Sequence, residues 1–307
     1  MDTHGIPCIS IVTPSYNQSE YIEKTIRSVR DQDYPRVEHI VIDGGSTDNS
    51  VEVLKAYDED ITYWESTPDR GQSHAINKGL KRATGDILAY LNSDDFYLPG
   101  TFEAVADLRR QSPKAGLLHG RCRYVNEQGD KVGSQYGRFD TVAELLDLWD
   151  VWWNERQVVQ PEVFWTREVY EAIGGFREDL NYVMDYDYWL RTLLAGFDVT
   201  RVDQEFTAFR FQPNQKSEES EAVADELRTL VKPYIWDQEV PVSQEVRERL
   251  QDMWLFDTHV LGTVRGSLER RESKIARWFR LFRSLTQHPR ILKSASFWNR
   301  VRTVLGS

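Results

Sequence analysis

The chain has 307 residues, of which 40% are hydrophobic and 28% charged, an ordinary mixture for a folded globular protein. Its formal net charge is −11, but residues 265–307 carry +9, so residues 1–264 carry −20. An acidic body argues against nucleic acid as the main ligand, because binding to a phosphate backbone requires a basic surface. The basic tail indicates a partner of its own.

Three features bear on the compartment. Cys8 and Cys122 are the two cysteines, and neither stands in a metal-ligand spacing, which predicts two buried thiols in a reducing compartment. We expect no signal peptide, because a strand-like run begins almost at once. No stretch approaches the roughly 18 uninterrupted apolar residues of a membrane span. The sequence therefore predicts a cytoplasmic protein, either free or peripheral on the inner face of the plasma membrane.

The first part of the chain alternates strand and helix patterns. Short apolar runs predict strands at residues 8–16, 38–46, 61–66 and 86–92, and helical spacing predicts helices between them. Asn17 and Ser19 are the expected caps of the first helix, and Thr47 or Asp48 that of the second. This alternation predicts a parallel sheet with right-handed crossovers.

After Pro99 the alternation is less regular. Helices are expected at residues 100–110 and 184–196, with a strand at residues 117–125. Residues 163–176 read as a strand, a short helix and a Gly-Gly turn. A strand pair is expected to end at Phe211, and mostly helical chain from Ser217 onward.

Polar clusters follow three of the predicted strands, at residues 13–17, 43–48 and 92–95. In an open parallel sheet, ligands bind at the carboxyl ends of the strands, so these clusters predict one shared site. Asp94 and Asp95 are adjacent carboxylates, whose repulsion a cation would offset. Their oxygens suit Mg²⁺ or Mn²⁺, and a turn before the next helix is the alternative.

Four segments in this order resemble the family 2 glycosyltransferases, which have the GT-A fold. They are residues 10–50 (beginning SIVTPSYN), 69–95 (DRGQ to NSDD), 158–176 (VVQPEVFWTREVYEAIGGF) and 184–191 (MDYDYWLR). The resemblance covers roughly residues 8–217. It implies an α/β, Rossmann-like mixed sheet flanked by helices.

The resemblance also implies a division of the chain. Residues 1–217 would form the GT-A catalytic domain, with a nucleotide-sugar-binding half at 1–98 and an acceptor half at 99–217. Residues 218–307 would form a helical extension that contains the basic amphipathic segment 265–307.

The function implied by the resemblance is that of a metal-dependent hexosyltransferase. It would move a sugar from a UDP-, dTDP- or GDP-sugar donor to a hydroxyl of a saccharide or lipid-linked acceptor, with inversion. The expected context is bacterial surface polysaccharide or glycolipid assembly. The alternatives are a nucleotidyltransferase, although no glycine-rich, Arg/Lys-bearing loop follows the first strand, and a non-catalytic nucleotide-sugar-binding module.

The resemblance assigns a nucleobase site to the first two strand ends. Asp43 would hydrogen-bond the base, and Thr13, Pro14 and Tyr16 would form the wall beside it.

A second group of positions would bind the remainder of the donor. Asp69 and Arg70 would lie near the ribose or diphosphate, and Asp94 near the ribose or sugar. Asp95 would bind Mn²⁺ or Mg²⁺, which neutralises charge on the departing diphosphate. Relatives often carry a His that Gln212 replaces here, so Gln212 would be a weaker metal ligand.

The base that accepts the proton of the acceptor hydroxyl would be Asp185. Asp187, two residues on, points to a different side of the helix, and Met184 replaces the Glu that usually precedes the base. A helix N-terminal carboxylate favoured by the helix dipole is the alternative for Asp185. Trp149, Trp152 and Trp153 form an aromatic cluster that is either a sugar platform or part of the core.

The basic segment 265–307 has one apolar helical stripe and a proline, Pro289, before a second basic helix. Trp and Phe on basic amphipathic helices suit an anionic membrane interface. Packing on the enzyme or on a second subunit is the alternative. The stripe consists of Ile275, Trp278, Phe279, Phe282 and Leu285.

Overall fold

The computed structural model describes residues 5–153, 157–212, 220–261, 282–283 and 286. The chain divides into two compact units, Met1–Thr141 with Glu155–Val223 and Val142–Asn154 with Ala224–Ser307. The predicted boundary after residue 217 lies outside the described residues, as does the basic segment 265–307 apart from residues 282, 283 and 286. Both therefore stay predictions.

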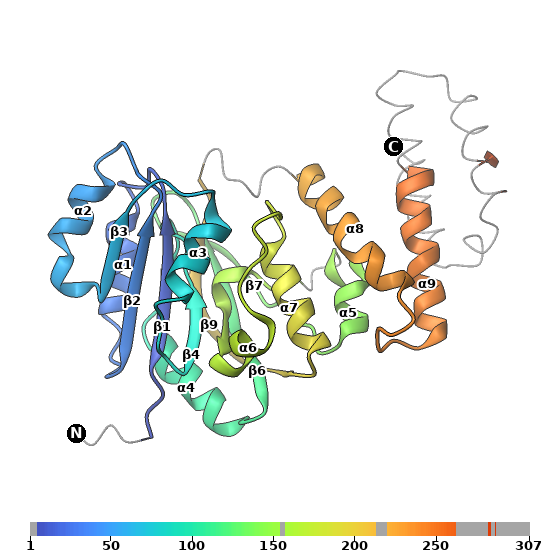
Figure 1. Ribbon diagram of the computed structural model, residues 1–307, viewed down its shortest axis with the longest axis horizontal. Helices are drawn as coiled ribbons and strands as arrows, with labels where there is room; N and C mark the ends of the chain where they lie inside the picture. The colour runs from blue at the N-terminus through green and yellow to red at the C-terminus, as the bar shows by residue number, and fades with distance from the viewer. Residues whose placement is uncertain (1–4, 154–156, 213–219, 262–281, 284–285, 287–307) are drawn as a thin grey trace. The chain divides into compact units, whose positions relative to one another are not determined.

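Strands and helices alternate from β1 to β4 and less regularly thereafter (Figure 1). The strands are β1 (Ile9–Ser15), β2 (Val37–Asp43), β3 (Tyr63–Ser66), β4 (Ile87–Tyr90), β5 (Phe96–Tyr97), β6 (Ala115–Val125), β7 (Lys131–Gln135), β8 (Val163–Thr166) and β9 (Asp198–Arg210). The α-helices are α1 (Ile22–Arg30), α2 (Ser50–Ala56), α3 (Gln72–Leu80), α4 (Thr101–Gln111), α5 (Val142–Leu146), α6 (Arg167–Ile173), α7 (Met184–Leu194), α8 (Ser220–Trp236) and α9 (Gln244–Leu255). Short helical turns are η1 (Asp58–Asp60), η2 (Leu148–Trp152), η3 (Gln160–Glu162) and η5 (Phe256–Leu261).

One sheet organises the first unit. Within the described residues its strand order is β3-β2-β1-β4-β8-β6-β9-β5, and β7 pairs with β6. The strands β3, β2, β1 and β4 run parallel to one another, as the strand and helix alternation predicts. β8 is antiparallel to both β4 and β6, whereas β6 and β9 are parallel. The predicted α/β class with a mixed sheet is therefore confirmed.

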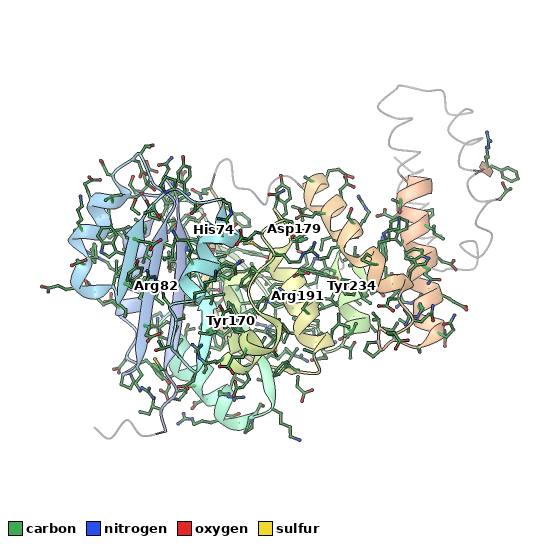
Figure 2. All side chains as sticks on the ribbon, viewed as in Figure 1. His74, Arg82, Tyr170, Asp179, Arg191 and Tyr234 are labelled. Carbon is green, nitrogen blue, oxygen red and sulfur yellow. The ribbon has the colours of Figure 1, made fainter. Side chains whose placement is uncertain are left out.

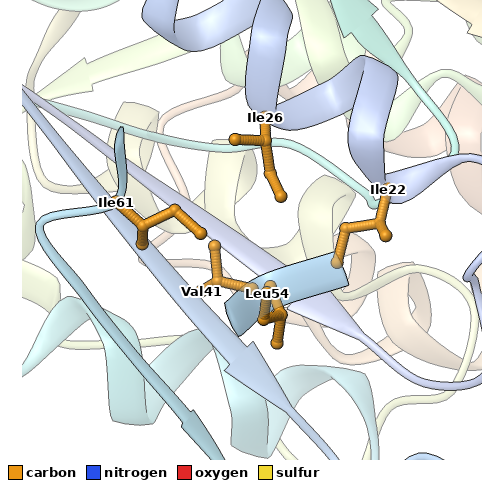
Figure 3. Close-up of a cluster of buried hydrophobic side chains, with 5 residues drawn as sticks. All are labelled: Ile22, Ile26, Val41, Leu54 and Ile61. Carbon is orange, nitrogen blue, oxygen red and sulfur yellow. The ribbon is translucent and has the colours of Figure 1, made fainter. Parts of the chain in front are cut away.

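Helices cover both faces of the parallel half of the sheet. Val41 of β2 packs with α1 and α2 in a cluster of five buried aliphatic side chains, which Figure 3 shows. Val12 of β1 lies beside Ile40, one position before Val41, and so faces the other way. A Cβ on Gly79 of α3 would meet Val12 Cγ1 at 2.4 Å. α3 therefore packs on the opposite face, at a distance that only glycine allows. The cluster consists of Ile22, Ile26, Val41, Leu54 and Ile61.

Some local predictions were wrong. Asn17 does not cap the first helix, since α1 begins at Ile22 and no side chain caps it. Asn17 has a positive φ of 53°, and its Oδ1 accepts a hydrogen bond from the Thr47 N–H at 2.8 Å. The predicted caps of the second helix, Thr47 and Asp48, were also wrong, because the N-cap of α2 is Asn49, whose side chain makes no cap hydrogen bond. Asp48 instead accepts from the N–H of Ser50, the first residue of the helix, at 3.0 Å.

Two further predictions need correction. The chain before Phe211 is not a strand pair, because β9 runs as one strand of 13 residues along β6, with register shifts. Cys122 is buried as expected, but Cys8 is partly exposed. Both thiols are free.

The second unit is helical in its described part. α9 is capped by Ser243, whose Oγ accepts a hydrogen bond from the Val246 N–H. The buried Arg228 guanidinium donates to Asp257 at 2.6 Å. Trp149 and Trp152 are buried, which supports a core role for them rather than a sugar platform. Within the described residues, none of the helices combines the length and apolarity that crossing a bilayer requires.

Candidate functional site

The ends of the parallel strands form a row at one edge of the sheet. Ser15, the last residue of β1, pairs with Asp43, the last residue of β2, which pairs in turn with Ser66 at the end of β3. The loops that leave these strands contain the predicted site residues. Because parallel strands end on the same side, the polar clusters separated in sequence lie along one edge.

Asp43 is fully buried, at 0% exposure, and its carboxylate holds the turn that follows β2. Its Oδ2 accepts hydrogen bonds from the N–H groups of Gly45 (3.1 Å) and Ser46 (2.8 Å) and from Ser66 Oγ (2.6 Å). Its Oδ1 accepts from Ser46 Oγ at 2.5 Å. Both oxygens are thus engaged within the protein, and a nucleobase contact of Asp43 stays a prediction.

Tyr16, Gly44 and Asp69 come together from three loops. A Cβ on Gly44 would lie 2.8 Å from Asp69 Oδ2 and 3.4 Å from Tyr16 Cδ2. Tyr16 is 59% exposed, whereas Thr13 and Pro14 are buried. The Thr13 Oγ1 lies 3.0 Å from Nε2 of His39, inside the sheet layer. Of the three predicted wall residues, Tyr16 is therefore the one whose side chain a ligand can reach.

Arg70 lies in the loop before α3, and its side chain forms an ion pair. Its Nη2 donates to Glu178 at 2.6 Å, in an ion pair exposed to solvent on both sides. Its backbone N–H donates to Nδ1 of His74, which Figure 2 labels, at 3.2 Å. The Asp69 Oδ1 accepts from the Gly71 N–H at 2.7 Å and so shapes the same turn.

Asp95 contrasts with Asp43 although it is equally buried, at 1% exposure. Its Oδ1 accepts a hydrogen bond from the Arg210 N–H at 3.0 Å. Its Oδ2 is buried and has no hydrogen-bond partner among the described residues. Burial and the neighbouring Asp94 carboxylate raise the pKa of Asp95, and hydrogen bonds from Arg210 and Asn92 oppose that rise. A buried carboxylate oxygen without a partner is costly and requires an explanation.

Asp94 accepts hydrogen bonds from the last residue of β9 and from the chain that follows it. Asp94 Oδ2 accepts a hydrogen bond from Gln212 Nε2 at 2.6 Å, and its carbonyl oxygen accepts from Arg210 Nε at 3.0 Å. The structure thus brings Asp94, Asp95 and Gln212 together. Gln212 donates through its amide nitrogen to Asp94, so its role as a metal ligand stays a prediction.

Asp185 lies in the first turn of α7 and is half-buried. Its Oδ1 accepts a hydrogen bond from the Tyr186 N–H at 2.7 Å. Burial, and then the negative charges of Asp185 and Asp95, raise the pKa of the Tyr90 phenol at the end of β4. Two contacts of α3 join the same regions: Gln72 Nε2 donates to Asn92 Oδ1 at 2.7 Å, and the adjacent Ser73 Oγ donates to the sulfur of Met184, the residue before Asp185.

The neighbours of Asp185 have structural roles. Asp187 is fully buried, and its Oδ2 accepts from Arg191, labelled in Figure 2, at 2.7 Å. Arg177 lies 3.6 Å from its other oxygen. The Met184 sulfur is buried and accepts from Ser73 Oγ at 2.6 Å. The expectation that Asp187 faces away from the position of Asp185 agrees with these contacts.

The described residues fit a divalent cation in part. No group of three or more His, Cys, Asp or Glu side chains in the described part of the chain is arranged to hold a metal ion. Asp95 Oδ2 is nevertheless a buried carboxylate oxygen to which no described residue donates a hydrogen bond. Mg²⁺ and Mn²⁺ bind in such places through one or two carboxylates, with water and phosphate completing the shell.

Sequence reasoning missed two polar residues close to this site, Gln160 and Glu162 of η3. Glu162 is 0% exposed, its Oε1 accepts from the Val159 N–H at 3.0 Å, and its Oε2 has no partner among the described residues. Gln160 Nε2 donates to the carbonyl oxygen of Tyr90 at 2.8 Å. The available signal was a carboxylate within an otherwise apolar run, VVQPEVFW.

Three comparisons with known proteins agree with this geometry. Residues 10–174 match the model of glycosyl transferase family 2. An uncharacterized glycosyltransferase of Mycobacterium tuberculosis, Rv1514c, is 44% identical over 199 residues, which are 63% of this chain and 72% of the relative.

Two solved structures show the same fold at low sequence identity. Staphylococcus aureus TarS 1-349 in complex with UDP-GlcNAc has a TM-score of 0.64 and 17% identity, over 92% of this chain and 80% of that one. The chain spans 43% of a longer TarS structure. The mannosyltransferase PcManGT from Pyrobaculum calidifontis, in complex with GDP-Man and Mn²⁺, has a TM-score of 0.62 and 18% identity, over 97% and 87% of the two chains.

The family match covers more than half of the chain, and the solved structures confirm the expected GT-A fold. The protein therefore belongs to glycosyl transferase family 2 and is a glycosyltransferase.

Proposed function

We propose that this glycosyltransferase moves a hexose from a nucleotide-diphosphate donor to an acceptor hydroxyl, with inversion at the anomeric carbon. The observation that carries the proposal is the pair of carboxylates, Asp95 and Asp185. Asp95 has a buried oxygen without a partner among the described residues, and Asp185 lies in the first turn of α7. Adjacent residues of α3, Gln72 and Ser73, hydrogen-bond Asn92 and Met184 beside these two carboxylates. A metal-binding carboxylate and a base close to each other are what direct displacement at a diphospho-sugar requires.

The donor would bind along the row of strand ends. Tyr16 and Asp69 meet at Gly44, where a Cβ would lie 2.8 Å from Asp69 Oδ2, so that glycine allows the Asp69 side chain to approach this loop closely. The turn held by Asp43 orients the backbone N–H groups of this loop. The solved structures with UDP-GlcNAc and GDP-Man support a nucleotide-sugar donor, and UDP-, dTDP- and GDP-sugars are the candidates.

The diphosphate would lie near Asp94, Asp95 and Arg70. Asp95, with weaker help from Gln212, would hold Mn²⁺ or Mg²⁺, and the PcManGT complex with Mn²⁺ supports this assignment. When bound, the cation would neutralise charge on the leaving diphosphate. Arg70 would exchange Glu178 for a phosphate oxygen, because guanidinium groups bind both kinds of oxyanion through paired N–H donors.

The reaction would be a single displacement. The acceptor oxygen forms a bond to the anomeric carbon while the bond from that carbon to the diphosphate oxygen breaks, and the nucleoside diphosphate leaves. Asp185 takes the proton of the acceptor hydroxyl. Its Oδ1 is held by the Tyr186 N–H, which fixes the orientation of the carboxylate. The acceptor would be a saccharide or a lipid-linked saccharide in surface polysaccharide or glycolipid assembly, at the inner face of the plasma membrane.

A donor screen tests the proposal. UDP-, dTDP- and GDP-sugars are compared by thermal shift with and without Mn²⁺, because a ligand of the folded state raises its apparent stability. Release of nucleoside diphosphate is then measured for wild type and Asp185→Asn. We expect one donor class to bind in both proteins and release to fall by about 10²–10⁴-fold in Asp185→Asn.

Glu52→Gln is the matched control, because it removes a carboxylate from the first turn of another helix, α2. It separates loss of a base from loss of a helix-dipole interaction. Unchanged release in Asp185→Asn would reject the base assignment. Formation of pyrophosphate from a sugar phosphate and a nucleoside triphosphate would instead show a nucleotidyltransferase.

A further inference from the structure

The turn between α6 and α7 is held by the side chain of one residue of α3, Asn77. Its Oδ1 accepts a hydrogen bond from the Phe176 N–H at 2.8 Å, and its Nδ2 donates to the Phe176 carbonyl oxygen, also at 2.8 Å. The same Nδ2 donates to Glu178 Oε1 at 3.4 Å. An amide side chain that accepts and donates at once pairs with a backbone unit as a neighbouring strand would. Asn77 therefore fixes both polar groups of the Phe176 backbone to α3.

The two glycines of this turn have different physical causes. Gly174 has a positive φ of 75°, a conformation that glycine adopts readily. The φ of Gly175 is not in that region, but a Cβ at this position would overlap Asn77 Oδ1. The close approach of the Asn77 side chain is therefore what requires glycine at position 175.

The helix that carries the predicted base holds the same turn from its own side. Arg191 of α7, labelled in Figure 2, donates to the carbonyl oxygens of Ile173 at 2.8 Å and Gly175 at 2.9 Å. The rings of Phe176 and Tyr188 stack with their centroids 4.4 Å apart. Hydrogen bonds and ring packing thus join the turn to α7, so a displacement of the turn would also displace this helix.

The first residues of α3 reach both sides of the candidate site. Gln72 donates to Asn92 Oδ1 at 2.7 Å, beside the predicted metal ligand. Ser73 donates to the sulfur of Met184, the residue before the predicted base. α3 therefore contacts α7 directly at Met184 and indirectly through the turn that Asn77 holds.

We propose that Asn77 is a positioning residue, which fixes the place of Asp185 relative to α3 through the turn between α6 and α7. This rests on the proposed function, since it acts through the proposed base. A base must lie within hydrogen-bond reach of the acceptor hydroxyl, and a small displacement slows the reaction strongly. A thioether sulfur is a weak acceptor, so the contact between Ser73 and Met184 holds α7 less firmly than the paired amide bonds of Asn77.

The first test separates turnover from donor binding, with the nucleotide sugar that wild type binds. Asn77→Ala removes the bonds to Phe176, and we expect kcat for nucleoside diphosphate release to fall by about tenfold. The donor Kd, measured by titration calorimetry, should change by less than about twofold. In the Asp185→Asn background the same substitution should have no further effect on kcat, because Asn77 acts through Asp185. A merely structural Asn77 would lower kcat by the same factor in both backgrounds.

Gly175→Ala tests the contact independently. Its Cβ would take the place of Asn77 Oδ1, so we expect kcat to fall by about tenfold here too. When Asn77→Ala is already present, Gly175→Ala should cost nothing further, since the overlapping atom has been removed. Independent, multiplicative losses in the double variant would overturn the role of this contact.

The matched control is Arg167→Ala, which also removes two hydrogen bonds to backbone carbonyls. These belong to Ala83 and Gly85, before β4, at the end of that strand away from the site. Arg167→Ala should lower the unfolding midpoint and leave kcat unchanged. An equal loss of kcat in Arg167→Ala would show that general destabilisation explains the effect of Asn77→Ala.

Hydrogen exchange supplies a readout that needs no turnover. The Tyr186 N–H, which donates to Asp185 Oδ1, should exchange about tenfold faster in Asn77→Ala and at the wild-type rate in Arg167→Ala. Unchanged Tyr186 exchange or unchanged kcat in Asn77→Ala would overturn the positioning role. Normal release in Asp185→Asn, or failure of every donor to bind wild type, would instead count against the proposed function.

Discussion

Buried carboxylates in the two halves of the sheet differ in how many of their oxygens accept hydrogen bonds. In the parallel half, Asp43 at 0% exposure receives hydrogen bonds on both oxygens from its own loop and from Ser66. In the mixed half and at its border, Asp95 and Glu162 are as deeply buried, yet each has one oxygen without a partner among the described residues. Burial alone therefore does not identify a ligand-binding carboxylate.

The difference has a physical origin in what each residue must do. A carboxylate that folds a turn is stabilised when every acceptor is used within the protein. A carboxylate that binds a cation or a hydroxyl must retain a free oxygen, and the folded protein bears that cost until a ligand binds. The Asp43 carboxylate is thus satisfied within the protein, whereas, on the proposed function, a cation would complete Asp95.

The largest expected effect is on turnover at Asp95. Asp95→Asn keeps an acceptor for the Arg210 N–H but replaces the oxygen that would bind the cation. We expect transfer to fall by about 10³-fold, because the cation contributes several kcal/mol to the transition state. The unfolding midpoint without metal should change little, since Oδ2 has no hydrogen bond to lose. Nucleotide release and thermal unfolding measure the two quantities. Full activity in Asp95→Asn would contradict the proposal that the Asp95 oxygen binds the cation, and with it the contrast between Asp95 and Asp43.

The next effect is on stability at Asp43. Asp43→Ala leaves the donors of Gly45, Ser46 and Ser66 without their acceptor, so we expect a loss of about 3 kcal/mol in the free energy of unfolding. Asp95→Ala removes the bonds from Arg210 and Asn92, fewer than at Asp43, and should cost about 1–2 kcal/mol. Urea unfolding of both variants gives the difference directly. Equal losses would mean that the number of hydrogen bonds does not distinguish the two carboxylates.

The hydrogen bonds that distinguish these carboxylates could not be predicted from the sequence. Periodicity predicted the strands and helices of the first half because their apolar residues are spaced for local structure. It could not show that Asn17 bonds to Thr47 rather than capping a helix, since that contact joins separate loops. The same limit made β9 look like a strand pair, because its pairing with β6 depends on distant residues.

The sequence indicated which residues belong to the site, but not which side chains they contact. The resemblance gave Asp94, Asp95 and Asp185, and the structure brings Asp94 and Asp95 together with Gln212. The sequence could not show that Arg70 pairs with Glu178, more than a hundred residues away. Glu162 was overlooked because no local pattern distinguishes a buried acid from one in a turn; η3 is buried by contacts with β6 and β9, which are distant in sequence.

A pH titration probes one buried histidine in each half. Burial lowers the pKa of His39 on β2 to about 3 and that of His119 on β6 to about 4, from 6.5. Both are neutral when folded, whereas the unfolded chain takes up protons below pH 6.5. Their stabilisation is thus complete above pH 6.5 and decreases by about 1.4 kcal/mol per pH unit for each histidine as the pH falls toward 4.

The readout for these histidines is a difference between variants. The raised pKa values of Asp95 and Glu162 act in the opposite direction, since burial of the acids favours their protonated forms. Urea unfolding of wild type, His39→Gln and His119→Gln from pH 7 to pH 5 therefore isolates each histidine by its change in slope. A slope that is the same in all three proteins would contradict the assignment.

The smallest effect concerns the ion pair between Arg70, in the loop before α3, and Glu178, in the chain before α7. Arg70 is exposed and pairs with Glu178, so a donor diphosphate would compete with that carboxylate. We expect Glu178→Gln to tighten donor binding by less than about fivefold, because exposed ion pairs contribute little. The gain should disappear at high salt, and Arg70→Ala should weaken binding, both measured by titration calorimetry. Weaker binding in Glu178→Gln would show the opposite role, in which Glu178 orients the Arg70 guanidinium toward the donor before the donor binds.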